Sequence, residues 1–92
     1  MTAKKHWWVY VLTSASRGTT YVGCTNDVSR RLSEHNGQRK GGAKSTRTSR
    51  PWSIGKVYGP YADRSEAQAI ECKVKKLRGQ ARLRWPWGSL FP

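Results

Sequence analysis

Glu71 is the acidic residue whose place in the sequence is hardest to explain by local structure. Asp63 and Glu66 have the spacing of a helix-capping pair, and Asp27 stands where it can cap an earlier helix. Glu34 falls on the outer side of that earlier helix. At about 100° per residue, Glu71 instead falls on the margin of the inward face of its own helix. A carboxylate there can pair with a neighbouring arginine, or it can hold a hard cation such as Mg²⁺, which commonly uses one or two carboxylates.

Arg31 and His35 lie four residues apart on the earlier expected helix. They fall on either side of the apolar stripe of Val28 and Leu32, within about 60° of it. Arg30 points well away from that stripe, so Arg31 is the better arginine candidate for a site. A helical histidine is more often structural than catalytic, and His35 alone does not decide between these roles.

Tyr10 and Tyr21 stand on two successive segments with the composition of β-strands. Strand tyrosines are usually packing residues. Here, however, they precede the helix that carries Arg31 and His35. This order lets two strands and one helix bring two tyrosines, an arginine and a histidine together.

The apolar pattern predicts the elements that position these side chains. Residues 7–12 form a continuous β-branched and aromatic run, typical of a strand buried on both faces, and a short turn leads to a second strand at residues 20–25. The two are expected to form an antiparallel hairpin. A helix follows at residues 28–36, capped by Asn26 or Asp27 and closed by Gly37.

The second half of the chain adds a loop, a strand, a helix and a tail. Residues 38–50 have no periodicity and are expected to be a mobile basic loop, followed by a third strand at residues 52–58. A second helix is expected to run from Asp63 to about Arg78, with Gly79 ending it. The tail, residues 80–92, mixes arginines with Trp85, Trp87, Leu90 and Phe91.

The charge of the chain indicates an anionic partner. Eighteen Lys and Arg against five Asp and Glu give a net charge of +13 in 92 residues, for which nucleic acid is the first candidate. A membrane surface is disfavoured because the charge is spread along the whole chain. The stretch Trp7 to Ser16, free of charged residues, is far shorter than the roughly 20 apolar residues that span a bilayer.

The start of the chain and its two cysteines bear on its location. Residues 1–6 lack the apolar segment and cleavage site of a secretory signal, so we expect an intracellular, reducing compartment, cytoplasm or nucleus, rather than secretion. Cys24 and Cys72 are then free thiols. Two cysteines, neither in a Cys-x-x-Cys pair, cannot supply a four-ligand structural zinc site.

The order and spacing of five sequence blocks resemble the GIY-YIG nuclease family. Trp8-Val9-Tyr10 stands at the first motif and Tyr21-Val22-Gly23 at the second, with Arg31 ten residues beyond Tyr21. Trp8 replaces the glycine of the first motif. The likeness is greatest to the structure-selective branch that cuts flaps and junctions, through the blocks Tyr21 to Thr25, Arg30-Arg31-Leu32, His35-Asn36-Gly37, Gly41 to Arg47 and Pro51-Trp52. The segment Lys73 to Leu77, which follows Glu71, also resembles the small stand-alone bacterial members.

This resemblance implies a fold and a domain organisation. The expected fold class is α/β, with a three-stranded antiparallel sheet flanked by helices in the order β-β-α-β-α plus a C-terminal tail. Residues 1–92 would form a single GIY-YIG domain, with its motif core at residues 7–78 and a basic aromatic tail at residues 79–92. Junction-cutting eukaryotic members add a zinc-binding domain that docks a partner, and no structural zinc is expected here; a protein partner stays unknown.

The resemblance also implies a metal-dependent DNA endonuclease. Glu71 is expected to hold one divalent metal, Mg²⁺ or Mn²⁺, against the scissile phosphate. Arg31 would bind the phosphate oxygens with its planar fork of donors. Tyr10 is the first choice of general base, Tyr21 would position the water or the phosphate, and His35 would hold a tyrosine in the correct protonation state.

Basic side chains near these residues are expected to bind DNA phosphates without choosing a sequence. The alternative for the loop is a solvated, flexible run of charge. The aromatic tail is expected to complete the small core, with stacking on unpaired bases as the alternative. The expected DNA-binding residues are Arg30, Arg39, Lys40, Lys44, Arg47 and Arg50.

Two rival functions fit parts of the same sequence. A non-catalytic nucleic-acid-binding module accounts for the size, the charge and the aromatic residues, but it leaves Glu71 unexplained. A sequence-specific restriction-type enzyme of the same fold is disfavoured because 92 residues leave little surface for reading bases. DNA, branched in its structure, is therefore the expected partner.

Overall fold

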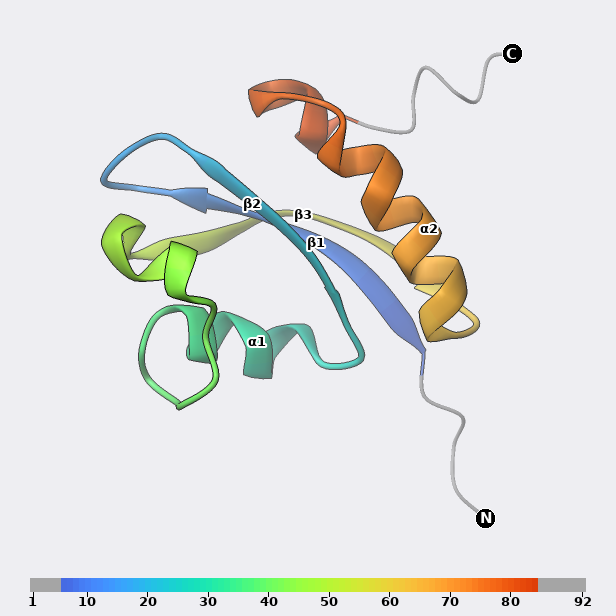
Figure 1. The fold of residues 1–92 in the computed structure, drawn as a ribbon, viewed down its shortest axis with the longest axis horizontal. Coiled ribbons are helices and arrows are strands. Elements are labelled where there is room, and N and C mark those ends of the chain that lie inside the picture. The colour runs from blue at the N-terminus through green and yellow to red at the C-terminus, as the bar shows by residue number, and fades with distance from the viewer. Residues whose placement is uncertain (1–5, 85–92) are drawn as a thin grey trace.

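The computed structural model describes residues 6–84, which contain one antiparallel sheet. Its strands are β1 (Trp7–Ser14), β2 (Thr20–Thr25) and β3 (Trp52–Tyr61), in the spatial order β2-β1-β3. Figure 1 shows β1 between the other two strands, with the β2 edge of the sheet facing the viewer. The expected α/β class and the order β-β-α-β-α are confirmed.

Two helices cover opposite faces of this sheet, as Figure 1 shows with α1 below it and α2 above it. They are α1 (Val28–His35) and α2 (Arg64–Lys75). Asp27 and Asp63 cap them, since each side chain accepts a hydrogen bond from a backbone N–H in the first helical turn. The sheet therefore has a helix to carry functional side chains on each of its faces.

Each face of the sheet has its own apolar core. Successive residues of β1 point to opposite faces, and all four from Val9 to Leu12 are at most 1% exposed. Val9 and Val11 pack toward α2 with Val22, Ala67 and Val74, whereas Tyr10 and Leu12 pack toward α1 with Trp52. This is the central strand buried on both faces that the apolar run predicts.

Strands β1 and β3 both end later in the chain than expected. β1 continues to Ser14, whose hydroxyl donates to the carbonyl of Ser49 at 2.7 Å. β3 continues past Tyr58 to Tyr61, which pairs with Trp7 at the start of β1. The apolar pattern does not reveal the β3 extension, because most residues of β3 are exposed.

The end of α2 also differs from the expectation. The helix stops at Lys75 rather than near Arg78, and Gly79 begins a short 3-10 helix, η2 (Gly79–Leu83). The guanidinium of Arg82 donates to the carbonyls of Lys75 and Leu77, which are left without helical partners. The carbonyls at the end of α2 are thus satisfied by a side chain of η2.

Residues 38–50 were expected to lack regular structure, and this expectation is wrong for η1, a 3-10 helix at Lys44–Ser49. Thr46 is fully buried and Ser49 is nearly so. The Thr46 hydroxyl is hydrogen-bonded to Ala43 and His35, and the Ser49 carbonyl accepts from Ser14, so a search for apolar periodicity misses both residues. The expected aromatic tail lies mostly in residues 85–92, outside the described residues.

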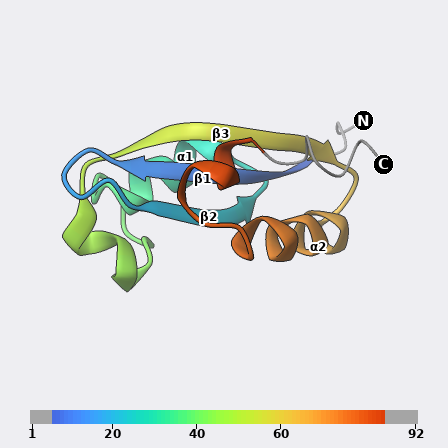
Figure 2. The same ribbon diagram turned by 90° about the horizontal axis from the view of Figure 1, so that it is seen from above.

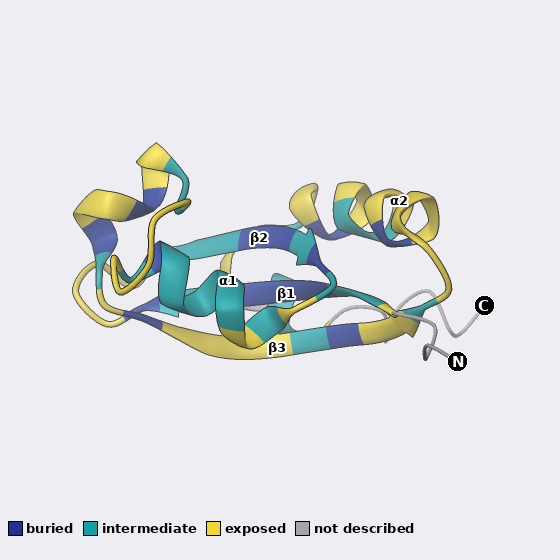
Figure 3. Ribbon diagram, turned by 90° about the horizontal axis from the view of Figure 1, so that it is seen from below, coloured by how far each residue is buried: buried dark blue, intermediate teal, exposed yellow. Residues whose placement is uncertain are grey.

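The molecule is thin along the viewing direction of Figure 1, as the turned view in Figure 2 shows. Its principal extents are 39 × 36 × 16 Å. Figure 3 shows the buried stripe of β1, the largely exposed β3 and the exposed outer side of α2. Among the described residues, no helix combines the length and the apolar character needed to cross a membrane.

Candidate active site

Tyr10 reaches the open edge of the sheet by crossing its neighbour strand. Tyr10 and Gly23 are directly paired in the register of β1 and β2. A Cβ added to Gly23 would lie 2.5 Å from the Tyr10 hydroxyl oxygen and 2.7 Å from its Cζ. The Tyr10 ring therefore lies against the backbone of Gly23, in space that a side chain at this position would occupy. This crossing brings a buried phenol toward the β2 edge, on the α1 face of the sheet.

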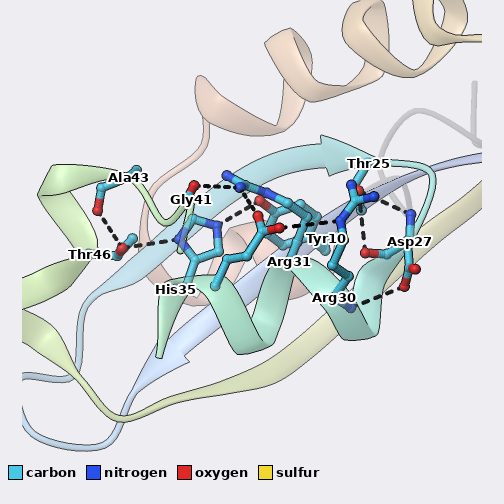
Figure 4. A network of polar contacts seen from close by, with 10 residues as sticks. Tyr10, Thr25, Asp27, Arg30, Arg31, His35, Gly41, Ala43 and Thr46 are labelled. Carbon is cyan, nitrogen blue, oxygen red and sulfur yellow. Dashed lines mark hydrogen bonds and ion pairs between the residues drawn. The ribbon is translucent and has the colours of Figure 1, made fainter. Parts of the chain in front are cut away.

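A chain of hydrogen bonds runs from this phenol into η1 (Figure 4). The Tyr10 hydroxyl lies 2.9 Å from Nε2 of His35, and Nδ1 of His35 lies 3.1 Å from Oγ1 of Thr46. Thr46 donates its own hydroxyl proton to the carbonyl of Ala43 at 2.7 Å. Its oxygen must then accept from His35, so the imidazole carries its proton on Nδ1. Nε2 is left as the acceptor for the Tyr10 hydroxyl.

The surroundings hold both groups of the Tyr10–His35 pair neutral. Burial, reinforced by the charge of Arg31, lowers the pKa of His35 to about 4. Burial raises the pKa of Tyr10 to about 12, although the adjacent Arg31 opposes this rise. In the absence of substrate, the proton therefore stays on the tyrosine oxygen.

Arg31 lies beside Tyr10 and is held from two other sides. Its Nη1 donates to the Glu34 carboxylate and, at 2.9 Å, to the carbonyl of Gly41. Burial lowers the pKa of Arg31, but hydrogen bonds with Tyr10 and Glu34 raise it further than burial lowers it. Its side chain is about a fifth exposed, at 22%. Arg31 is thus a fixed cation with a side open to solvent.

Glu34 does not lie on the outer side of its helix, as the sequence suggested. Its side chain is only 14% exposed and pairs with both Arg30 and Arg31. The segment around Gly41 folds back over it, because a Cβ on Gly41 would contact the Glu34 carboxyl carbon at 3.2 Å. Helical periodicity cannot reveal a loop that covers the helix from outside.

Glu71 approaches from α2, on the other face of the sheet. It forms an ion pair with Lys75 at 2.8 Å and is 17% exposed, whereas the Lys75 side chain is 55% exposed. The alternative of an ion pair is therefore realised, but with a lysine rather than an arginine. Burial raises the pKa of the Cys24 thiol to about 11, and a hydrogen bond to Glu71 adds to the rise. Glu71 is also near enough to Tyr10 for its charge to raise the pKa of the phenol.

Tyr21 packs among the aromatic rings on the α1 face. Its ring centroid lies 4.7 Å from that of His35 and 6.3 Å from those of Tyr10 and Trp52. These contacts are the ordinary packing role that strand tyrosines usually have. They also place Tyr21 against both Tyr10 and His35.

The comparison with known proteins can be set against this geometry. Residues 6–84 match the GIY-YIG catalytic domain. The chain belongs to the GIY-YIG family. This assignment confirms the expected enzyme class, a GIY-YIG endonuclease domain.

Two kinds of relative are similar to this GIY-YIG chain. A UPF0213 protein of Xanthomonas axonopodis pv. citri is 38% identical over 85 residues, covering 92% of this chain and 79% of the relative. The structure-specific endonuclease subunit slx1 of Schizosaccharomyces pombe is 53% identical over 76 residues, covering 82% of this chain and 23% of the relative. A structure-specific endonuclease subunit SLX1 homolog of Cryptosporidium parvum is 36% identical over 79 residues, covering 77% of this chain and 19% of the relative. The chain spans about a fifth of the length of these two SLX1 relatives.

The GIY-YIG fold brings four of the five expected catalytic residues into direct neighbourhood. Tyr10, Tyr21, Arg31 and His35 interact on the α1 face of the sheet. Glu71 comes to them from the opposite face, near the β2 edge. Their catalytic roles remain a proposal that rests on this placement.

The expected DNA-binding residues differ in how free their side chains are. Arg39, Lys40, Lys44 and Arg47 are exposed, whereas Arg30 is tied to Glu34. Arg50 donates from Nε to the carbonyl of His35 at 2.6 Å, so part of its guanidinium holds the end of α1. Arg39, Lys40, Arg47 and Arg50 border an open cavity of about 370 Å³, which is also lined by the carboxylate-bearing Glu34 and by three glycines.

Sequence reasoning missed two residues of this GIY-YIG site. Thr46 fixes the tautomer of His35, and Gly23 admits the Tyr10 ring. Gly23 carries a usable signal, since an isolated glycine within a strand often marks the close approach of another group. Thr46 lies in the block Gly41 to Arg47, but the polar composition of this segment gives no sign that Thr46 is buried against His35.

Proposed function

We propose that this GIY-YIG domain is a metal-dependent endonuclease that hydrolyses DNA phosphodiester bonds. The observation that carries the proposal is the chain Tyr10–His35–Thr46, which meets Arg31 at the edge of the sheet that Glu71 approaches. Phosphodiester hydrolysis needs a proton acceptor for water, a cation for the phosphoryl oxygens and help for the leaving oxygen. The site has a candidate for each of these needs.

The proton acceptor in this proposal is the Tyr10 oxygen. Tyr10 takes a proton from the attacking water while its own proton moves to Nε2 of His35. The low pKa of His35 opposes this transfer in the free protein, in part because of the charge of Arg31. A phosphate bound to Arg31 offsets that charge and makes the imidazole a better proton acceptor. Substrate binding and proton transfer are thereby coupled through one arginine.

Glu71 is the side chain that would hold a divalent cation, Mg²⁺ or Mn²⁺. A single carboxylate suffices, because waters and phosphate oxygens complete the coordination of Mg²⁺. The surroundings fit this role, since Glu71 is partly exposed and its partner Lys75 has a mostly exposed side chain that can swing into solvent. When bound, the cation would stabilise negative charge on the leaving oxygen.

We propose branched DNA, such as flaps and junctions, as the substrate. The SLX1 relatives are named structure-specific endonuclease subunits, and the GIY-YIG match, residues 6–84, includes every residue of the proposed site. The positive charge of the chain favours contacts to DNA backbone, which carry no sequence information. An intracellular setting with access to DNA follows from this proposal.

Cleavage of defined DNA substrates tests the proposed function. The protein is incubated with flap, junction and linear duplex DNA, with and without Mg²⁺ or Mn²⁺. We expect metal-dependent cuts near branch points in wild-type protein and none with Glu71→Gln, because an amide is a poor ligand for these cations. Glu71→Gln should still bind the DNA.

Glu66→Gln is the matched control, because it removes an exposed carboxylate from the same helix. It should cut like the wild type. Persistent cleavage by Glu71→Gln would contradict the metal assignment. Binding without any cleavage by wild-type protein would favour the non-catalytic nucleic-acid-binding module.

A further inference from the structure

A second basic cavity lies on the α2 side of the β2 edge, away from η1. It has a volume of about 670 Å³ and is bordered by the β1–β2 turn, residues 18–20, and by the end of α2, residues 75–79, together with Arg82. Figure 1 shows the end of α2 and η2 beside the start of β2, on the side of the sheet opposite α1. None of the expected DNA-binding residues borders this cavity.

The charges at this cavity differ in how far they are neutralised. Lys76 and Arg78 are exposed, and within the described residues neither has an acidic partner. Lys75 is paired with Glu71. Two full positive charges are thus available to an anion in the cavity, and a third lies next to the proposed catalytic carboxylate.

The negative end of the α2 dipole does not cancel this potential. Arg82 donates from Nε to the carbonyl of Leu77 and from Nη2 to that of Lys75, both at the end of the helix. It also donates from Nη1 to Oγ1 of Thr20 at 3.0 Å, which ties the end of α2 to β2. Because Arg82 already donates to the carbonyls at the end of α2, Lys76 and Arg78 are not needed there and can bind a ligand.

We propose that this cavity binds backbone phosphates of the DNA substrate on the side of the cut away from the η1 loop. The inference rests on the proposed function. An internal bond that is cut has backbone on both sides of it, and the residues around η1 account for one side only. Lys75 connects the second cavity to Glu71, so a strand that passes the β2 edge between α1 and α2 meets both basic regions.

A simpler role for Lys76 and Arg78 is stabilisation of the helix end, since cations are favoured there. The two roles predict different outcomes. Helix stabilisation affects the melting temperature and leaves DNA binding unchanged. Phosphate binding lowers DNA affinity and also reduces the number of counterions that binding releases.

The test measures binding of a fluorescent flap DNA to uncut complexes, in the Glu71→Gln background, over a range of salt concentrations. Lys76→Gln and Arg78→Gln are compared with Lys56→Gln, which removes an exposed lysine from β3, the strand at the other edge of the sheet. Each cavity variant should reduce the slope of log affinity against log salt by about 1, and the double variant should lose on the order of tenfold in affinity. Lys56→Gln should change neither quantity.

Two further measurements separate this proposal from the proposed function. Arg39→Gln and Arg47→Gln probe the η1 side in the same assay, and wild-type cleavage is measured in parallel. If the η1 variants weaken binding while Lys76→Gln and Arg78→Gln match Lys56→Gln, the second subsite is overturned and the nuclease proposal stands. A lower melting temperature with unchanged salt dependence would also overturn it. If wild-type protein does not cut the DNA at all, the proposed function itself fails.

Discussion

Thr46 controls which nitrogen of His35 can accept the proton of Tyr10. Its hydroxyl proton is committed to the Ala43 carbonyl, so its oxygen holds the imidazole N–H on Nδ1. Without that acceptor, the imidazole is free to place its proton on Nε2, where it would block transfer from Tyr10. Thr46, a buried threonine of the block Gly41 to Arg47, is thus a positioning residue for the proposed general base.

Thr46→Val should therefore lower the single-turnover cleavage rate on the order of a hundredfold, within the usual range for general-base catalysis. Thr46→Ser keeps the hydroxyl and should restore most of the rate. The affinity for uncut DNA should stay the same in both variants. Thr48→Val, which changes an exposed threonine of η1, is the control. Equal rates for Thr46→Val and wild type would contradict the role of the tautomer.

His35 should also make stability depend on pH. Its pKa is about 4 in the folded protein and about 6.5 when unfolded, so the unfolded chain binds more protons between these values. This contribution to stability is complete above about pH 6.5 and is lost as the pH falls toward 4. The difference corresponds to roughly 3 kcal/mol at most.

Melting temperatures measured from pH 7 to pH 4 test this dependence. The melting temperature of wild-type protein should fall steeply over this range, and His35→Gln should flatten the decline although it lowers stability at pH 7. His6→Gln removes an exposed histidine and should leave the decline unchanged. A decline of the same steepness in His35→Gln would show that another group causes it.

At the scale of elements, β2 is shaped by the side chain that crosses it. Gly23 is buried, yet it has no side chain of its own, and the Tyr10 ring occupies the space above it. The glycine of the second motif is therefore a steric requirement for the tyrosine of the first. The two motifs describe one contact between neighbouring strands.

Gly23→Ala should place a methyl group against the Tyr10 ring and push the hydroxyl away from His35. We expect its cleavage rate to fall to that of Tyr10→Phe, with a lower melting temperature because a buried ring must move. Cleavage rates of the two variants, measured on the same flap DNA, check this expectation. Wild-type activity in Gly23→Ala would mean that Tyr10 works without crossing at this point.

The predictability of these elements depended on what holds each one in place. β1, β2 and α1 follow from apolar patterning and from the Asp27 cap, so the sequence predicts them closely. η1 and the end of α2 depend on polar contacts with distant residues, Thr46 to His35 and Arg82 to Thr20, and no local pattern encodes them. The five expected catalytic residues could be named from motif spacing and helix geometry, whereas the buried position of Thr46 beside His35 could not.

At the scale of the whole molecule, the site lies where both faces of a thin sheet can contribute to it. With a shortest dimension of 16 Å, side chains from α1 and α2 can both reach the open edge of β2. An exposed strand edge is usually a risk for unwanted pairing between chains. Here the basic side chains on both sides make approach by a second copy of this +13 chain unfavourable, while they attract DNA.

The separation of Glu71 from the Tyr10–His35 pair by the sheet has a consequence for synthesis of the protein. The chain emerges from the ribosome in order, so the proton-transfer residues and Arg31 exist before α2 does. A partly made or partly folded chain can gather positive charge and bind DNA, but it lacks the carboxylate that completes the proposed chemistry. Docking of α2 onto β1 and β2 is therefore the step that would complete the proposed site, so cleavage is expected only from the fully folded chain.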